Sequence, residues 1–406
     1  MTAEKSEANC PTCARPLPAP GAKCPHCTST LVIWSRSRTV FLSICGLLLI
    51  PLFTVTGVFV RMFHDKQARI ADDWRRAGQV NLAAARSNVA VEDFRNALLY
   101  SPDSTQLQLE LAEALAQQGR LDEAQNYLLN LRSGDPENSL INLQLAHIAS
   151  THGDALAATS YFHDAMYGHW PDDPHSHQLA TRKELIEFFL SHNRRDSARA
   201  ESLSMAAENP ADPEIRAQAA DFLLQAGDAQ SSLSEYERVL RMEPGNAQAL
   251  VGSGKAALAL GRFALATQDF TLAIQKGSKD PETARNKNVA SAAENLNPYD
   301  TRLNDRDRQK RILRLFSLAE ERATSCLPGV LPSPNAATPD QLKPLAAQRA
   351  ALPKDLNARE LATHLEIEKP VLDWVFAVES EAASRCGVGT PENAAIGLIG
   401  ATRKET

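Results

Sequence analysis

The sequence predicts a mainly α-helical chain: an α-solenoid of helix–turn–helix repeats with capping helices, preceded by a small cysteine-rich module and one transmembrane helix. Three observations predict it: two close pairs of cysteines near the N-terminus, an uncharged apolar run after Arg38, and a residue pattern that recurs from residue 71. With 43% hydrophobic but only 6% aromatic residues, the core must be built largely from alanine and leucine, which favours closely packed helices.

The cysteine pairs come first in the chain. Cys10 with Cys13, and Cys24 with Cys27, each present two thiolates that can bind one tetrahedral ion, and four thiolates suit zinc. A module of about thirty residues buries too little apolar surface to fold alone, so a bound metal would supply the missing stability. The alternatives are a pair of disulfides or a redox CxxC motif, but the latter needs a βαβ scaffold that this proline-rich stretch does not supply. We therefore expect residues 1–35 to bind one Zn²⁺ ion.

The two Cys-Pro-x-Cys knuckles also resemble the zinc-ribbon module at the front of many bacterial membrane proteins. The resemblance is confined to this module. It implies a structural or recognition site rather than a catalytic one, because four protein ligands leave no open position for a substrate.

The apolar run follows the cysteine module. Between Arg38 and Arg61 there is no charged residue, and the run is long enough to cross a hydrocarbon layer of about 30 Å as a helix. A cleaved signal peptide is the alternative, but the module ahead would be too long an n-region and the run exceeds the usual apolar segment. We expect a retained transmembrane helix at residues 39–61.

Two arguments about its orientation disagree. The flank after the run is more basic than the flank before it, so the positive-inside rule would place the helical body in the cytoplasm. The residues concerned are Arg61, Lys66, Arg69, Arg75 and Arg76 after the run, and Lys23, Arg36 and Arg38 before it. A zinc site, however, needs reduced thiolates, whereas two isolated cysteines in the body can pair in an oxidising space. Giving redox state more weight, we expect a single-pass protein of a bacterial inner membrane, with the cysteine module cytoplasmic and the body periplasmic.

The body repeats a helix–turn–helix pattern with a period of about 34 residues. Small residues allow two helices to cross closely, and a large residue on the second helix fills the gap between units. In the first unit, residues 71–104, the diagnostic positions are Trp74, Ala77, Gly78, Ala90, Phe94, Ala97 and Pro102. The further units are residues 105–138, 139–172, 179–212, 213–246 and 247–280.

These offsets resemble the tetratricopeptide repeat, and the resemblance covers residues 71–280. The unit at 179–212 is the weakest, because Ser202 replaces the expected aromatic residue and Arg182 the opening large one. We expect that unit to be distorted. The resemblance implies a solenoid of about six repeats that presents a curved inner groove to a peptide or a neighbouring protein.

The first helix of each repeat is expected to line this groove with exposed polar side chains. The candidates are Arg75, Gln79, Gln108, Asn142, Arg182, Arg216 and Gln248. The sequence presents no set of nucleophile, base and orienting group, so we expect no catalytic residues and no small-molecule substrate. The net charge of −6 also gives no reason to expect a nucleic-acid partner.

We therefore predict a non-catalytic membrane scaffold that mediates protein–protein interactions. One alternative is a signalling or regulatory protein whose zinc ribbon recruits a cytoplasmic partner. A weaker alternative is an accessory subunit in envelope assembly or secretion.

Beyond the repeats, capping helices are expected over residues 281–327, a proline-rich linker over 328–345 and a further helical segment over 346–406. Val371, Leu372, Val375, Val378 and Ala382 share one apolar helix face, which must pack on something. Cys326 and Cys386 each end a predicted helix, so a disulfide would join the C-terminal helix to the capping helices. The alternative is two unrelated free thiols.

A group of histidines and a glycine-rich string resemble functional motifs, but both have a structural explanation. Seven of the ten histidines lie between His147 and His192, and we interpret them as loop and helix residues rather than metal ligands. The string from Gly252 to Lys255 resembles a phosphate loop but lacks the preceding strand. We expect its small residues to serve helix packing.

Overall fold

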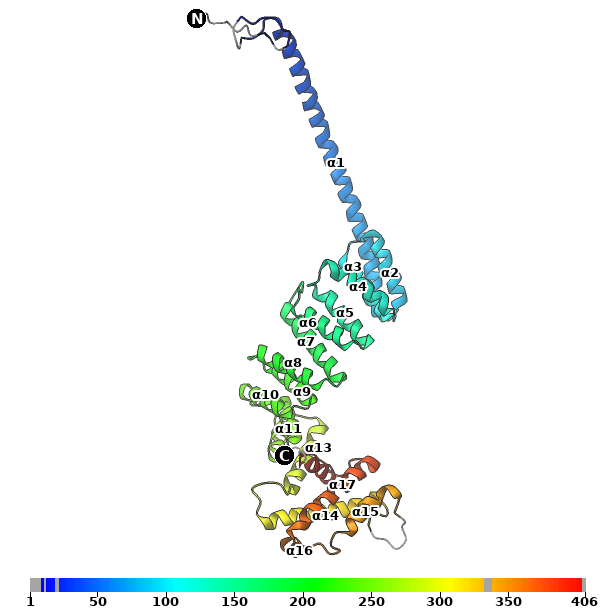
Figure 1. Ribbon diagram of the computed structural model, residues 1–406, viewed down its shortest axis with the longest axis vertical. Helices are drawn as coiled ribbons and strands as arrows, with labels where there is room; N and C mark the ends of the chain where they lie inside the picture. Colours follow the sequence, from blue (N-terminus) through cyan, green and yellow to red (C-terminus); the bar gives the residue numbers. More distant parts are fainter. Residues whose placement is uncertain (1–8, 11, 19–21, 332–337, 404–406) are drawn as a thin grey trace, which may run out of the picture. The chain divides into compact units, whose positions relative to one another are not determined.

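The computed structural model describes residues 9–10, 12–18, 22–331 and 338–403, without side chains for residues 28–40, 43 and 45. The remaining parts of the predicted cysteine module, linker and C-terminal segment lie outside the described residues. Those described are almost entirely helical (Figure 1), apart from turns and one β-bridge between Asn9 and Pro16. The mainly α prediction is confirmed. The chain divides into two compact units, residues 1–152 and 153–406.

The first unit contains the cysteine module and five helices. They are α1 (Thr28–Ala83), α2 (Ser87–Tyr100), α3 (Thr105–Gln117), α4 (Leu121–Gly134) and α5 (Ser139–His152). Each of α2 to α5 packs against the helix before it in the chain. This is the helix-on-neighbour order expected of stacked repeats.

The second unit continues the helix pairs and ends in a cluster of helices. The pairs are α6 (Ala155–Tyr167), α7 (Pro174–Ser191), α8 (Arg195–Glu208), α9 (Pro213–Gln225), α10 (Ala229–Met242), α11 (Ala247–Ala259) and α12 (Phe263–Gln275). The cluster contains α13 (Pro281–Leu296), α14 (Asp305–Cys326), α15 (Lys343–Ala350), α16 (Ala358–Thr363), α17 (Glu368–Cys386) and α18 (Pro391–Thr402), with 3₁₀ turns at Asp340–Leu342 and Leu365–Ile367.

The small and large positions of the repeats meet as the sequence predicts. A Cβ atom built on Gly78 would lie 2.7 Å from the ring of Phe94, and one on Gly254 would lie 2.8 Å from the ring of Phe270. Such a contact is too close for any side chain, so glycine is needed where these helices cross. Gly252 likewise faces the Tyr236 ring. The residues that resembled a phosphate loop therefore serve packing inside α11.

The turn inside each repeat has a shared backbone conformation. One residue there has a positive φ, at Ala85, Gly119, Gly153, Asn193, Gly227 and Gly261. Glycine adopts this left-handed conformation without a steric penalty, and asparagine tolerates it. The recurrence supports the predicted register of six units.

The repeat expected to be distorted keeps both of its helices, α7 and α8. Ser202 is buried in the aromatic position and its hydroxyl donates a hydrogen bond to the Ala198 carbonyl at 2.7 Å. Phe188 of α7 packs near Phe162 with ring centroids 5.9 Å apart. This repeat thus has an aromatic contact with the repeat before it, made by its first helix.

The C-terminal helices share one hydrophobic core with the last repeat. This core includes Ala257 and Phe270 of the repeat and extends to Ile399 of α18. The predicted apolar face of α17 is buried in it, at Val371, Leu372, Val375, Val378 and Ala382. Trp374, also fully buried, donates from Nε1 to the Leu345 carbonyl at 3.2 Å. We call α13–α18 the C-terminal module.

Two segments differ from the sequence-based boundaries. The predicted linker, 328–345, ends inside helical structure, because α15 begins at Lys343 with Pro344 in its first turn. Proline is favoured there because the first helical N–H has no intrahelical partner. The segment 39–61, predicted as a separate membrane helix, is part of a longer helix. This helix, α1, includes Pro51 and runs without interruption into the first repeat.

Within the described residues, α1 is the helix long and apolar enough to cross a membrane, and none of its apolar window is buried. Large apolar side chains project from it, including Leu47, Phe53 and Phe59, each about 71–72% exposed. A helix that is apolar all round needs either a protein or a lipid environment.

Candidate functional site

The cysteine module gathers four sulfur atoms from two chain reversals. The Sγ atoms of Cys10, Cys13, Cys24 and Cys27 all lie within 4.8 Å of one another, and those of Cys13 and Cys24 are 3.7 Å apart. In the first reversal, the N–H of Cys10 donates to the Arg15 carbonyl at 2.8 Å. The spacing of the two CxxC pairs thus brings their thiols together.

The geometry of this cluster fits a tetrahedral metal. Four sulfur ligands about 2.3 Å from zinc have sulfur–sulfur edges of roughly 3.8 Å, close to the 3.7 Å separation of Cys13 and Cys24. Backbone N–H groups of Thr12 and Cys13 lower the pKa of Cys10 to about 6. The hydrogen bond with Cys13, together with burial, raises the pKa of Cys27 to about 12. A bound cation would stabilise the thiolate form of all four sulfurs.

At the C-terminal end, Cys326 of α14 and Cys386 of α17 are joined by a disulfide, with Cα atoms 6.3 Å apart. The bond closes a loop with a sequence separation of 60 residues. It connects two helices that already share the apolar core of the C-terminal module.

The candidate groove residues divide into two groups. Arg75 and Gln79 of α1 both bond to Glu110 Oε1 of α3, at 3.4 and 2.9 Å. Gln108 donates to the Pro102 carbonyl at 2.7 Å. These three lie within the first unit and retain some exposure, whereas Gln248 lies in the second.

Three candidates are buried, so the prediction that they are exposed is wrong. The exposed fraction is 0% for Asn142, 2% for Arg182 and 8% for Arg216. Asn142 donates to the Pro136 carbonyl at 2.9 Å, and Arg216 to the Pro210 carbonyl at 3.0 Å. Each side chain therefore ties the first helix of its repeat to the loop that precedes it. Gln108 makes the equivalent bond.

Arg182 has a different arrangement. Its guanidinium lies 2.7 Å from Glu208 and 3.6 Å from Glu201, and it donates to the Tyr167 hydroxyl at 3.1 Å. Arg182, which stands at the repeat position expected to hold a large apolar side chain, thus forms an internal ionic link between α7 and α8. Its Nε atom has no hydrogen-bond partner among the described residues.

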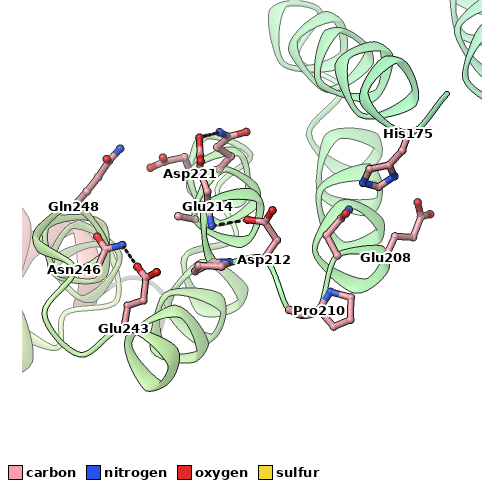
Figure 2. A pocket seen from close by; sticks show the side chains of 14 residues that line it. His175, Glu208, Pro210, Asp212, Glu214, Asp221, Glu243, Asn246 and Gln248 are labelled. Carbon is pink, nitrogen blue, oxygen red and sulfur yellow. Dashed lines mark hydrogen bonds between the residues drawn. The ribbon is translucent and has the colours of Figure 1, made fainter. Parts of the chain in front are cut away.

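A hollow of about 880 Å³ lies along helices and loops of the second unit. Figure 2 shows its labelled polar side chains in three groups. His175 and Glu208 form one, Asp212, Glu214 and Asp221 the next, and Glu243, Asn246 and Gln248 the last. Of the predicted groove residues, Gln248 lines it. We call this feature the acidic hollow.

Its lining contains five carboxylates, from Glu208, Asp212, Glu214, Asp221 and Glu243, and no lysine or arginine. Several carboxylates are held by local bonds. Asp212 accepts from the N–H groups of Glu214 and Ile215 at 2.9 and 3.0 Å and caps α9, while Asn246 donates to Glu243 at 2.8 Å. The hollow therefore has an excess of negative charge on a rigid frame.

The sequence prediction missed these acidic residues. Asp212 lies in the loop before α9, Asp221 lies within α9, and Glu243 directly follows α10. The recurrence of an N-capping Asp or Asn at Asp212 and Asn246, one period apart, was the available signal. It identifies the loop ends that contribute to the hollow, although it does not show which side chains converge.

Comparisons with known proteins identify the repeats. Residues 81–148 and 218–281 each match a family model described as tetratricopeptide repeat. Cellulose synthase operon protein C of Escherichia coli K12 is 27% identical over 195 residues, which is 47% of this chain and 16% of that protein. The O157:H7 counterpart is 26% identical over 191 residues, with the same coverage. This chain thus spans about one sixth of the length of these relatives.

Solved structures of repeat proteins are also similar to parts of the chain. YrrB, described as a TPR protein with an unusual peptide-binding site, is 17% identical with a TM-score of 0.35, covering 48% of this chain and 96% of YrrB. The C-terminal part of a TPR repeat-containing protein from Cytophaga hutchinsonii is 13% identical with a TM-score of 0.42, covering 60% and 94%. PilW, described as a type IV pilus biogenesis factor, is 17% identical with a TM-score of 0.36, covering 53% and 97%.

Proposed function

Since residues 81–148 and 218–281 are tetratricopeptide repeats, we propose that the chain is a membrane-anchored scaffold that binds a protein partner in the acidic hollow. Repeat stacks commonly bind peptides or protein surfaces rather than transform substrates. The observation that carries the proposal is a hollow of about 880 Å³ whose lining has five carboxylates and no lysine or arginine.

The charge of the hollow indicates the chemistry of the partner. Complementary charges guide encounter and exclude wrong partners, so a segment rich in lysine or arginine is favoured. Arg182 pairs with Glu208, but no salt bridge within the described residues involves Glu214 or Glu243. These two carboxylates are exposed and can pair with cations of the partner.

The experiment is crosslinking in native membranes followed by mass spectrometry, comparing the parent with a Glu214→Lys, Glu243→Lys double variant. Charge reversal should remove the partners that the parent captures through the hollow. Glu187→Lys is the matched control, because Glu187 is an exposed residue of α7 outside the hollow. Loss of the same partners in the control, or their retention in the double variant, would argue against this binding site.

We also propose that Cys10, Cys13, Cys24 and Cys27 bind a structural zinc ion and that residues 39–61 of α1 cross the membrane. Exposed apolar side chains around α1 support the anchor. The close approach of four sulfur atoms supports the metal site. With four protein ligands, zinc would fold the module and present its surface, without an open coordination position for chemistry.

The proposed orientation places the cysteine module in the cytoplasm and the repeats in the periplasm. Free thiols are maintained in a reducing compartment, whereas disulfides persist in an oxidising one. The pairing of Cys326 with Cys386 supports this arrangement. The greater positive charge after the anchor argues for the reverse orientation, so compartment-specific labelling of both cysteine sites is the deciding test.

A role in envelope assembly or secretion is the second candidate. The similarity to cellulose synthase operon protein C favours it, although that similarity involves 16% of the relative. An envelope role would be tested by identifying the crosslinked partner. A partner from an export or assembly system would support this candidate, whereas a cytoplasmic signalling protein bound to the cysteine module would favour the regulatory alternative.

A further inference from the structure

The C-terminal module contains a second cavity, separate from the acidic hollow. It has a volume of about 720 Å³ and lies among α11, α13, α17 and α18. Val289, Phe376, Ile396 and Leu398 contribute apolar surface, and polar groups are fewer. Small-molecule sites have this character, with volumes of about 300–1,000 Å³, mainly apolar walls and a few polar groups. We call it the C-terminal pocket.

Gly397 of α18 leaves part of this pocket open. A Cβ atom built there would have no atom within 4 Å. By contrast, a Cβ atom on Gly400 would lie 2.9 Å from the Phe376 ring. Gly400 is therefore needed for close packing of α17 and α18, whereas Gly397 borders space that the chain itself does not fill.

Glu379 of α17 supplies a buried acceptor in the pocket wall. It is 3% exposed, and its Oε2 accepts from Asn393 Nδ2 at 3.2 Å and lies 3.8 Å from Arg322 Nε. The Asn393 amide is oriented by Thr390, whose N–H donates to Oδ1 at 3.1 Å. Within the described chain, no hydrogen bond is made to Glu379 Oε1. A ligand that donates a hydrogen bond to this unused acceptor is therefore favoured over one that has no donor.

The mouth of the pocket limits the kind of donor. Arg285 of α13 lines it and is exposed, and no salt bridge of Arg285 occurs within the described residues. A cationic ligand would be repelled by this guanidinium, whereas a neutral hydroxyl would not. The apolar walls favour a hydrocarbon body, and Phe376 can pack against a ring.

We propose that the C-terminal pocket binds a small, mainly apolar alcohol, whose hydrocarbon body occupies the space beside Gly397 and Phe376 and whose hydroxyl donates to Glu379. Asn393 and Arg322 are positioning residues for the carboxylate. The sequence predicted no small-molecule substrate, and this proposal concerns a bound ligand rather than a reaction. It does not depend on what occupies the acidic hollow.

The test uses the full chain in lipid nanodiscs and compares p-cresol with toluene by ligand-observed NMR titration. The two probes have similar shapes, but only p-cresol can donate to Glu379. A net hydrogen bond of about 1.4 kcal/mol corresponds to tenfold tighter binding of p-cresol. Equal binding of the two probes would overturn the assignment of Glu379 as the acceptor.

Two variants and one control locate the binding. Gly397→Leu should fill the pocket and abolish saturable p-cresol binding, while Gly134→Leu should not, although a Cβ atom at Gly134 of α4 is equally unobstructed. Glu379→Met keeps a side chain of similar length without the carboxylate oxygens, and the ratio of p-cresol to toluene affinity should fall to about one, because a thioether is only a weak acceptor. Circular dichroism verifies that each variant is folded. Unchanged p-cresol binding in folded Gly397→Leu would overturn the site.

Discussion

The cysteine module and the C-terminal module use cysteine in opposite chemical states. Cys10, Cys13, Cys24 and Cys27 form no disulfide although their sulfur atoms lie within 4.8 Å of one another, whereas Cys326 and Cys386 form one. The apolar part of α1 separates the two sites in sequence. A membrane between a reducing and an oxidising compartment would allow both states in one chain.

The two modules also differ in how far their folding depends on their cysteines. Around the four cysteines, the one partly buried apolar side chain that packs against them among the described residues is Leu17. The disulfide, by contrast, lies beside a core that extends from Ala257 to Ile399. A small module without a core needs metal to fold, while a module with a core gains only additional stability from a covalent link.

The largest expected effect is therefore metal removal from the cysteine module. We predict about one zinc ion per chain by elemental analysis, with apparent binding free energy on the order of 10–16 kcal/mol at neutral pH, as for other structural zinc sites. Cys10→Ser should lose the metal and the convergence of the remaining cysteine side chains. Cys326→Ser should retain the metal, because it removes a cysteine outside the cluster. Absence of zinc from the parent would reject the metal site.

The next effect is reduction of the Cys326–Cys386 bond. Closing a loop of 60 residues stabilises by at most about 4 kcal/mol on the chain-entropy account. Hydrogen exchange should become faster in α17 and α18 after reduction and remain unchanged in α2–α4. Faster exchange throughout the chain would mean that the effect is not local to the C-terminal module.

The same bond reports the compartment. Membranes prepared with a thiol trap and then denatured should show Cys326 and Cys386 labelled by a maleimide reagent only after reduction. The four N-terminal cysteines should label after chelation without reduction. If Cys326 and Cys386 label fully without reduction, the periplasmic assignment loses its main support.

The stability of the C-terminal module and the zinc affinity of the cysteine module should change in opposite directions with pH. Burial raises the pKa of Glu379 from 4.5 to about 7 in the folded C-terminal module. Between these values the folded state binds more protons than the unfolded state, so its free energy of unfolding falls as pH rises, by at most about 3 kcal/mol. Zinc affinity should rise over the same range, because the thiols must lose protons to bind metal. Denaturation of the parent and Glu379→Gln from pH 4.5 to 7 isolates the contribution of Glu379, and equal slopes would contradict it.

The smallest effect concerns the repeats between the two cysteine sites. Gln108→Ala removes a bond to the Pro102 carbonyl and should lower stability by about 1 kcal/mol, the usual net value of one hydrogen bond. Asn142→Ala removes two bonds from a fully buried side chain and should lower it more. Neither variant should alter zinc content or the disulfide. If urea denaturation showed that neither variant changes the free energy of unfolding, the structural role assigned to these side chains would be wrong.

The sequence alone determined the features that depend on local spacing. The recurrence of small residues such as Gly78 and Gly254, with Phe94 and Phe270 at the following large positions, predicted the stacked helices, because one steric requirement repeats in every unit. The positive φ at Gly261 fits the turn in the predicted register. The two CxxC pairs likewise predicted four converging thiols, since each pair lies within one short chain reversal.

Only the tertiary structure decided which polar residues are available to a partner. Their positions within the repeat predicted that Asn142, Arg182 and Arg216 are exposed in the groove. In the structure all three are buried, and Asn142 and Arg216 bond to the loops before their helices. The acidic hollow and the pocket beside Glu379 combine residues from several helices. Helical periodicity specifies the face on which a side chain lies, whereas its burial, its charge state and the cavity next to it depend on neighbours that are distant in the chain.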